Sequence, residues 1–240
     1  MKKWMFIFIL LPSFLTAQEK TIVYDEMAEE RKLPAFTELS VEGGINVYLS
    51  PFGKQAVAVS AREAGFRDLI VTEVEGGRLR IRMGTRKGSS RGDMRLKVYV
   101  SVPRLEKIIA NGASDIFVNG ILKGDELQIQ LNGASDFAGA VDVEKLRVQQ
   151  TGASDSRLSG RVNLLQVQLS GASDMKSYGC AVNDLEAMVS GASRLEVNVN
   201  RELTVTASGA SDVFYKGKGV VKKLTSTGAS TIRAVISTDQ

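Results

Sequence analysis

Residues 127–155, LQIQLNGASDFAGAVDVEKLRVQQTGASD, contain one complete unit of a repeat. The tripeptide Gly-Ala-Ser occurs seven times in the chain, at steps of 21, 19, 19, 20, 18 and 19 residues. Five copies continue with Asp, and the other two have Arg194 and Thr231 in that place. A short, fixed period indicates a repeat architecture in which each unit stacks on the previous one. The motif glycines are Gly112, Gly133, Gly152, Gly171, Gly191, Gly209 and Gly228.

Apolar and polar residues alternate on both sides of each motif. The sixth residue before the motif glycine is Leu in the five middle copies, and the fourth is apolar in all seven. The second is apolar except for Gln150 and Ser226, and polar residues such as glutamine and arginine lie between these positions. Because successive side chains of a strand point to opposite faces, each copy is predicted to contain a strand with one buried face. A second short strand is predicted to follow the motif. In it the fourth residue after the motif glycine is apolar in every copy except one, which has Ser156.

A strand, a bend, a second strand and a turn within about 19–20 residues predict one rung of an all-β, parallel β-helix, or β-solenoid. Rungs stack at about 4.8 Å, so equivalent residues form columns. Each leucine or valine buried in such a column contributes about 1.5–3 kcal/mol. We expect Gly to adopt a backbone angle that other residues avoid, and Ser to bond to neighbouring backbone or to the next Ser. We expect Ala to face the interior where the corner narrows it. A sandwich of antiparallel hairpins is disfavoured, because it does not require the same side chain at the same place in each strand.

The chain is predicted to have three parts. Residues 1–17 are interpreted as a signal peptide, because Lys2 and Lys3 precede an apolar run that ends at Ala17 and is too short for a spanning helix. Residues 18–34 are interpreted as a loose polar leader. Residues 35–240 are interpreted as a single β-solenoid domain, with further strands in 35–103 and the Gly-Ala-Ser repeats in 104–240. A loop is predicted over residues 84–93, and its Arg-Gly-Asp tripeptide is interpreted as a hydrophilic turn.

The composition of the mature chain restricts its partners and its compartment. With the signal peptide removed, the 31 basic residues fall to 29 against 27 acidic ones, a balance too weak to indicate nucleic-acid binding. Cys180 is the only cysteine, so no internal disulfide can form, and we interpret its side chain as packed. No second segment is apolar enough to span a bilayer. We expect a protein secreted across the inner membrane to the periplasm, the outer-membrane surface or the medium.

The segment FTELSVEGGINVYLS at residues 36–50, followed by the Gly-Ala-Ser-Asp repeats, resembles a known family. This is the "putative auto-transporter adhesin, head GIN" domain family, found in Bacteroidetes-type bacteria. The similarity extends from about Phe36 to about Val235. It implies an exported β-helical protein, and it assigns no catalytic residue.

The aspartates after the motif are the candidate binding residues, because they would form a ladder exposed along one side of the stack. Unit charges about 5 Å apart repel by about 0.8 kcal/mol in water, so such a ladder requires relief. Backbone contacts in each turn, flanking basic residues, or cations could supply it. The aspartates are therefore open to three interpretations: turn residues, a polar recognition surface, or ligands for a metal. We assign no metal and no cofactor. The ladder comprises Asp115, Asp136, Asp155, Asp174 and Asp212.

Two classes of function remain. The first is a non-catalytic, adhesin-like or scaffold module that binds a glycan or an envelope protein at the cell surface or in the periplasm. The second is a carbohydrate-active enzyme on a β-helix, which would require two convergent carboxylates outside the repeat register. The chain contains no histidine, no nucleophile elbow and no phosphate-binding loop. We therefore favour the non-catalytic class.

Overall fold

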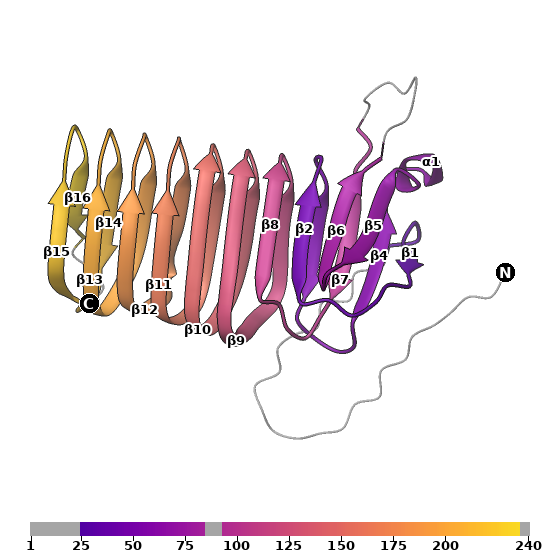
Figure 1. Ribbon diagram of the computed structural model, residues 1–240, viewed down its shortest axis with the longest axis horizontal. Coiled ribbons are helices and arrows are strands. Elements are labelled where there is room, and N and C mark those ends of the chain that lie inside the picture. The colour runs from indigo at the N-terminus through magenta and orange to yellow at the C-terminus, as the bar shows by residue number, and fades with distance from the viewer. Residues whose placement is uncertain (1–24, 85–92, 236–240) are drawn as a thin grey trace.

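The computed structural model describes residues 25–84 and 93–235, which are almost entirely β. The repeats form a parallel β-solenoid with rungs stacked in a row (Figure 1). Each long strand begins just after one Gly-Ala-Ser motif and ends at or shortly before the next. The predicted fold class is thus confirmed. These strands are β9 (Asp115–Gly133), β10 (Asp136–Gly152), β11 (Asp155–Leu169), β12 (Asp174–Val189) and β13 (Arg194–Ala207).

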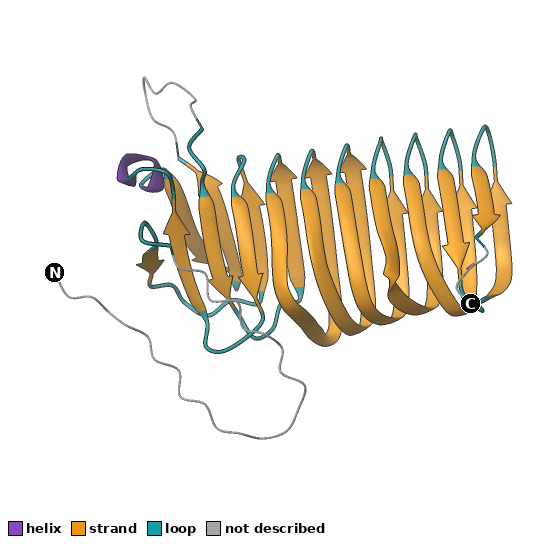
Figure 2. Ribbon diagram, turned by 180° about the vertical axis from the view of Figure 1, so that it is seen from behind, coloured by secondary structure: helices purple, strands orange, loops and turns teal. Residues whose placement is uncertain are grey.

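The register follows the sequence repeat. Residues of β10 pair in parallel with residues 19 positions later in β11, from Asp136–Asp155 to Gln150–Leu169. In the repeats the motifs form tight corners along one edge of the stack, whereas at the opposite edge each of the strands β9 to β13 curves without a break (Figure 2). The turn predicted after the second strand is not a break: Gly160, which lies there, has a φ of +102° but stands inside the continuous strand β11. One rung is therefore one strand wrapped around the core.

The apolar positions form columns inside the solenoid. The five leucines that lie six residues before a motif glycine, from Leu127 to Leu203, are at most 2% exposed. The columns end at the last rung, which no further rung covers: there Leu224 is 39% exposed and Lys222 replaces the column leucine. The last elements are β14 (Asp212–Lys216), β15 (Val220–Ser226) and β16 (Thr231–Ala234).

The two polar exceptions inside the middle of the stack, Gln150 at the end of β10 and Ser156 at the start of β11, flank one corner and bond to each other. Ser156 Oγ donates to Gln150 Oε1 at 2.6 Å. Gln150 Nε2 donates to the carbonyl oxygens of Ser154 at 2.7 Å and Asp174 at 3.3 Å. Both side chains are buried, and their mutual bond avoids the cost of about 1–3 kcal/mol for an unsatisfied buried polar group. Their partnership could not be predicted from the repeat pattern.

The segment Gly43–Asn46 is itself a corner of the solenoid. Strand β2 (Glu38–Glu42) pairs in parallel with β8 (Lys107–Gly112), which places Glu42 beside Asn111. Strand β3 (Asn46–Ser50) pairs in parallel with β9. Gly-Gly-Ile-Asn therefore occupies the place of Gly-Ala-Ser-Asp in the adjacent rung, and Ile45 is buried where the repeats have Ser. The sequence indicated a turn here but not its equivalence to the repeated corners.

One further rung follows this one in sequence but lies on its other side in space. Strands β6 (Arg78–Met83) and β7 (Lys97–Ser101) pair in parallel with β2 and β3, opposite to the repeats. Beyond them, β5 (Ile70–Glu75) and β4 (Ala56–Ser60) pair antiparallel with β6 and β7, and β1 (Glu29–Arg31) pairs antiparallel with β4. The one-turn helix α1 (Ala64–Arg67) lies between β4 and β5. Antiparallel strands, which the sequence did not predict, thus cover the N-terminal end.

Several predictions concern residues outside the described ranges. The signal peptide and residues 18–24 of the leader are among these, as are residues 85–92 of the predicted loop, including Arg91 and Gly92. The remainder of the leader is not loose as predicted, because it includes β1. Its start is fixed by Tyr99, whose hydroxyl donates to Asp25 Oδ2 at 2.8 Å.

Candidate functional site

The corners are built on glycines with left-handed backbone angles. Gly133 has a φ of +84°, and the motif glycines together span +73° to +86°. The rungs are tied together at this point, because the amide of Ala134 donates to the carbonyl of Gly112 in the rung before at 2.7 Å. A Cβ on Gly133 would lie only 2.7 Å from that same carbonyl oxygen. Both the backbone angle and the close contact therefore require glycine.

The alanine and the serine of the motif point to opposite sides of the corner, and the alanine does not face the interior as predicted. The motif alanines are exposed on the outside of the corner, and the serines of the first six copies are buried. After the left-handed glycine the chain reverses, so the next residue points outward and the following one inward. Ser135 Oγ then donates to the carbonyl of Asn132 at 3.0 Å, which satisfies the inward hydroxyl. Alanine is compatible with the outside because nothing there requires a larger side chain.

The five aspartates stand in one in-register column beside the corners, interrupted by Arg194 before the last of them, and all five are half-buried. Asp155 pairs with Asp136 in one neighbouring rung and with Asp174 in the other. Burial raises the pKa of Asp155, and the carboxylates of Asp136 and Asp174 raise it further. Burial and Asp136 likewise raise the pKa of Asp115.

Flanking basic residues partly relieve the column. Lys176 Nζ lies 3.4 Å from Asp174 Oδ2, and Arg194 lies 3.9 Å from Asp212 Oδ2. Among residues 25–84 and 93–235, no group of three acidic, histidine or cysteine side chains is placed to hold a metal ion. Cys180 is buried, and its pKa is raised to about 11 by that burial, so its thiol is protonated at neutral pH.

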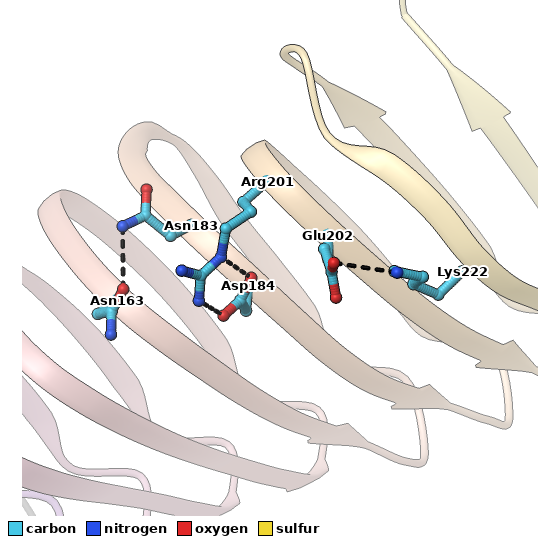
Figure 3. A network of polar contacts seen from close by, with 6 residues as sticks. All are labelled: Asn163, Asn183, Asp184, Arg201, Glu202 and Lys222. Atoms are coloured by element: carbon cyan, nitrogen blue, oxygen red, sulfur yellow. Dashed lines mark hydrogen bonds and ion pairs between the residues drawn. The ribbon is translucent and has the colours of Figure 1, made fainter.

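The edge opposite to the corners carries ion pairs between rungs (Figure 3). Arg201 binds Asp184 through two guanidinium nitrogens and lowers the pKa of that carboxyl. Lys222 Nζ lies 3.1 Å from Glu202 Oε1 in the same part of the stack. These charges are matched across neighbouring rungs, so this edge joins rungs to each other.

A ladder of glutamine amides crosses one flat face of the repeats. Gln130 Nε2 donates to Gln149 Oε1 at 2.8 Å, and Gln149 Nε2 donates to Gln168 Oε1 at 2.9 Å. These outward residues lie three positions before the motif glycine in successive rungs. The next place in the row is occupied by Met188, which pairs with Gln168 in register and is 63% exposed.

Two cavities lie on this face, with volumes of about 420 and 450 Å³. The first spans five rungs, from Gln128 to Thr206, and the second lies nearer to the corners. Both are lined by Gln149, Gln168 and Met188, so they adjoin along the ladder. We call this surface, with the side chains of both cavities, the glutamine groove. Four spacings between rungs give it a length of about 19 Å.

The groove was not among the predicted binding residues. Its glutamines were identified in the sequence only as the polar partners of buried residues. The only signal in the sequence was that the glutamines recur at the same two places in successive copies. The aspartates recur in the same way, so recurrence alone did not mark the glutamines as a binding surface. The cavities arise from side-chain lengths on a stacked face, which the pattern of polar and apolar residues does not specify.

The fold and these surfaces define the class of protein: an all-β parallel solenoid built on Gly-Ala-Ser corners. Residues 35–219 match the model of the family described as "Putative auto-transporter adhesin, head GIN domain", and the chain belongs to this family. No curated protein matches the chain in sequence. Within the described ranges, none of the helices is long and apolar enough to cross a membrane.

Solved structures share the fold at low sequence identity. A "putative adhesin" from Bacteroides fragilis is 22% identical with a TM-score of 0.81, over 87% of this chain and 96% of that one. A "putative lipid binding protein" from Parabacteroides distasonis is 18% identical with a TM-score of 0.67, over 87% and 96%. A "putative adhesin" from Parabacteroides merdae is 16% identical with a TM-score of 0.67, over 87% and 95%.

Proposed function

We propose that this protein is an exported, non-catalytic binding module of adhesin type, located at the cell surface or in the periplasm. It holds a glycan or a protein ligand on the flat face of its repeats. The observation that carries the proposal is the glutamine groove, an open surface of amides and hydroxyls continuous across five rungs. Membership of an adhesin-type family and the names of two structural neighbours support the same function.

The chemistry of the groove favours binding over catalysis. Glycoside hydrolysis by its usual route requires two carboxyl groups, about 5–10 Å apart, on either side of the scissile bond. Among the residues that line the two cavities, Glu186 is the only carboxylate, and it accepts a hydrogen bond from Gln166 Nε2 at 2.7 Å.

Two experiments test the proposal. In the first, intact native cells would be treated with protease, and cell fractions would be probed with an antibody to the protein. The protein should be absent from the cytoplasmic fraction, and its mature N-terminus should lie near Gln18. The purified mature chain would be screened on a glycan array and against envelope proteins, with reducing-end assays on every bound glycan. Binding without release of reducing ends is expected. Turnover of any glycan, or a cytoplasmic protein that retains residues 1–17, would contradict the proposal.

A further inference from the structure

We infer that the ligand of the glutamine groove is a neutral oligosaccharide lying across the rungs. The amides of Gln149 and Gln168 would bond its hydroxyls, and Met188 would pack against the C–H face of one sugar ring. This inference rests on the proposed function and narrows it to one class of ligand and one surface.

The two charged residues of the groove, Arg147 and Glu186, already bond to other side chains of the protein. Arg147 forms an ion pair with Glu126 in the rung before and donates to Gln166 Oε1 at 3.1 Å. Gln166 in turn donates to Glu186, so the row consists of charged groups joined through an amide. An anionic ligand is bound most strongly by guanidinium groups that are free to form paired hydrogen bonds. The one guanidinium among the lining residues, that of Arg147, is already paired with Glu126, so its positive charge is balanced within the protein, and this favours an uncharged ligand.

The hydrogen-bonding capacity left in the ladder matches hydroxyl groups. A glutamine amide has two N–H donors and two acceptor lone pairs. At Gln149 the ladder uses one donor and one acceptor, which leaves one of each for a ligand. Gln168 accepts from Gln149 but has no acceptor for its own amide among the described residues, because Met188 follows it. A sugar hydroxyl both donates and accepts, so adjacent hydroxyls can use these groups together.

Met188 supplies the apolar contact in this polar row. Its neighbours in register are Gln168 and Thr206, and along the chain Glu186 and Ser190, two residues before and after it, line the same groove. A polarizable thioether adapts to irregular apolar surfaces, such as the C–H face of a pyranose. Protein partners are usually held by aromatic or arginine anchors in desolvated pockets. Neither cavity is lined by an aromatic residue, and the one lining arginine, Arg147, is already paired with Glu126, so the groove offers a protein partner no free anchor of this kind.

The test uses the mature chain with ¹³C-labelled methionine methyl groups. A glycan array carrying both neutral and acidic glycans selects the probe, and the best-bound neutral oligosaccharide is then titrated by NMR. The Met188 methyl signal should shift, whereas that of Met175, which is fully buried inside the stack, should not. Gln149→Ala combined with Gln168→Ala should weaken binding about tenfold or more. Arg157→Ala, an exposed change on the opposite face, should leave binding unchanged.

The outcomes separate this inference from the proposed function. A bound glycan that shifts no Met188 signal, or whose affinity survives the double substitution, would overturn the groove assignment and leave the binding function intact. Preference for acidic glycans, or no binding on the array, would overturn the neutral-glycan assignment. If a protein ligand is bound instead, the neutral-glycan assignment is overturned and the proposed binding function stands. Circular dichroism of each variant excludes loss of folding as the cause.

Discussion

Replacing Gly133 with Ala tests whether the motif glycine is required by the contact between rungs as well as by its own backbone angle. Gly133 and Gly112 are motif glycines of adjacent rungs with nearly equal φ values, +84° and +81°. A Cβ on Gly133 would lie 2.7 Å from the carbonyl oxygen of Gly112, whereas the nearest atom to a Cβ on Gly112 is the amide nitrogen of Gly43, at 3.7 Å. The two substitutions therefore share the conformational cost and differ in the contact.

The magnitudes follow from these two effects. A non-glycine residue in the left-handed region costs about 1–2 kcal/mol, which both variants incur. In Gly133→Ala the new methyl group also displaces the carbonyl that accepts from Ala134, and the loss of that hydrogen bond costs about 1–1.5 kcal/mol. Gly133→Ala should therefore lower the free energy of unfolding by about 3 kcal/mol, and Gly112→Ala by about half as much.

Urea denaturation followed by far-ultraviolet circular dichroism measures both values. Gly53→Ala is a further control, because Gly53 has a φ of +72° and a Cβ there would meet no atom within 4 Å. It should lose about as much stability as Gly112→Ala. If Gly133→Ala costs no more than the two controls, within about 0.5 kcal/mol, the contact between rungs does not explain the repeated glycine.

Three other substitutions or reactions follow from the structure. Because burial and the neighbouring carboxylates keep the pKa of Asp155 raised, Asp155→Asn should stabilise the fold by about 1 kcal/mol at pH 7 and low salt. That gain should vanish at pH 3, where the wild-type carboxyl is protonated in both the folded and the unfolded chain. An equal gain at both pH values in urea titrations would refute the view that the negative charge of Asp155 destabilises the fold. Ser156→Val should lower the free energy of unfolding by about 1–3 kcal/mol, and adding Gln150→Leu should recover most of this loss. A double-mutant cycle measures both, and purely additive losses would mean that the two side chains act independently. Cys180 should react with a thiol reagent at pH 8 only as fast as the protein unfolds, and rapid labelling of the folded chain would contradict its burial.

The sequence supports the fold more directly than it supports the site. The period of the motif and the leucine column predict parallel rungs, because only stacked rungs place equivalent residues in contact. The inward serine and outward alanine could not be predicted, since their directions depend on how far the left-handed glycine turns the chain. The antiparallel strands β4 and β5 were also missed, because their alternation is the same for either direction of pairing.

The candidate site shows the same limit. The column of aspartates such as Asp136 and Asp155 is visible as a repeat, and the structure places it beside the corners in register. The glutamine groove depends on which outward rows stand beside each other and how long their side chains are. Met188 became informative only when its exposure and its place in the ladder were known.

The position of the β2–β3 rung has a consequence for how the chain folds. This rung lies between β6–β7 on one side and β8–β9 on the other, although both neighbours follow it in sequence. In chain order the stack therefore extends in two directions from its earliest rung, first toward the N-terminal end and then, after the chain crosses back, through the repeats. Loss of rungs from the C-terminus shortens the stack one layer at a time, whereas loss of β2 and β3 divides it. A chain emerging N-terminus first from the ribosome would present the β2–β3 rung before any repeat.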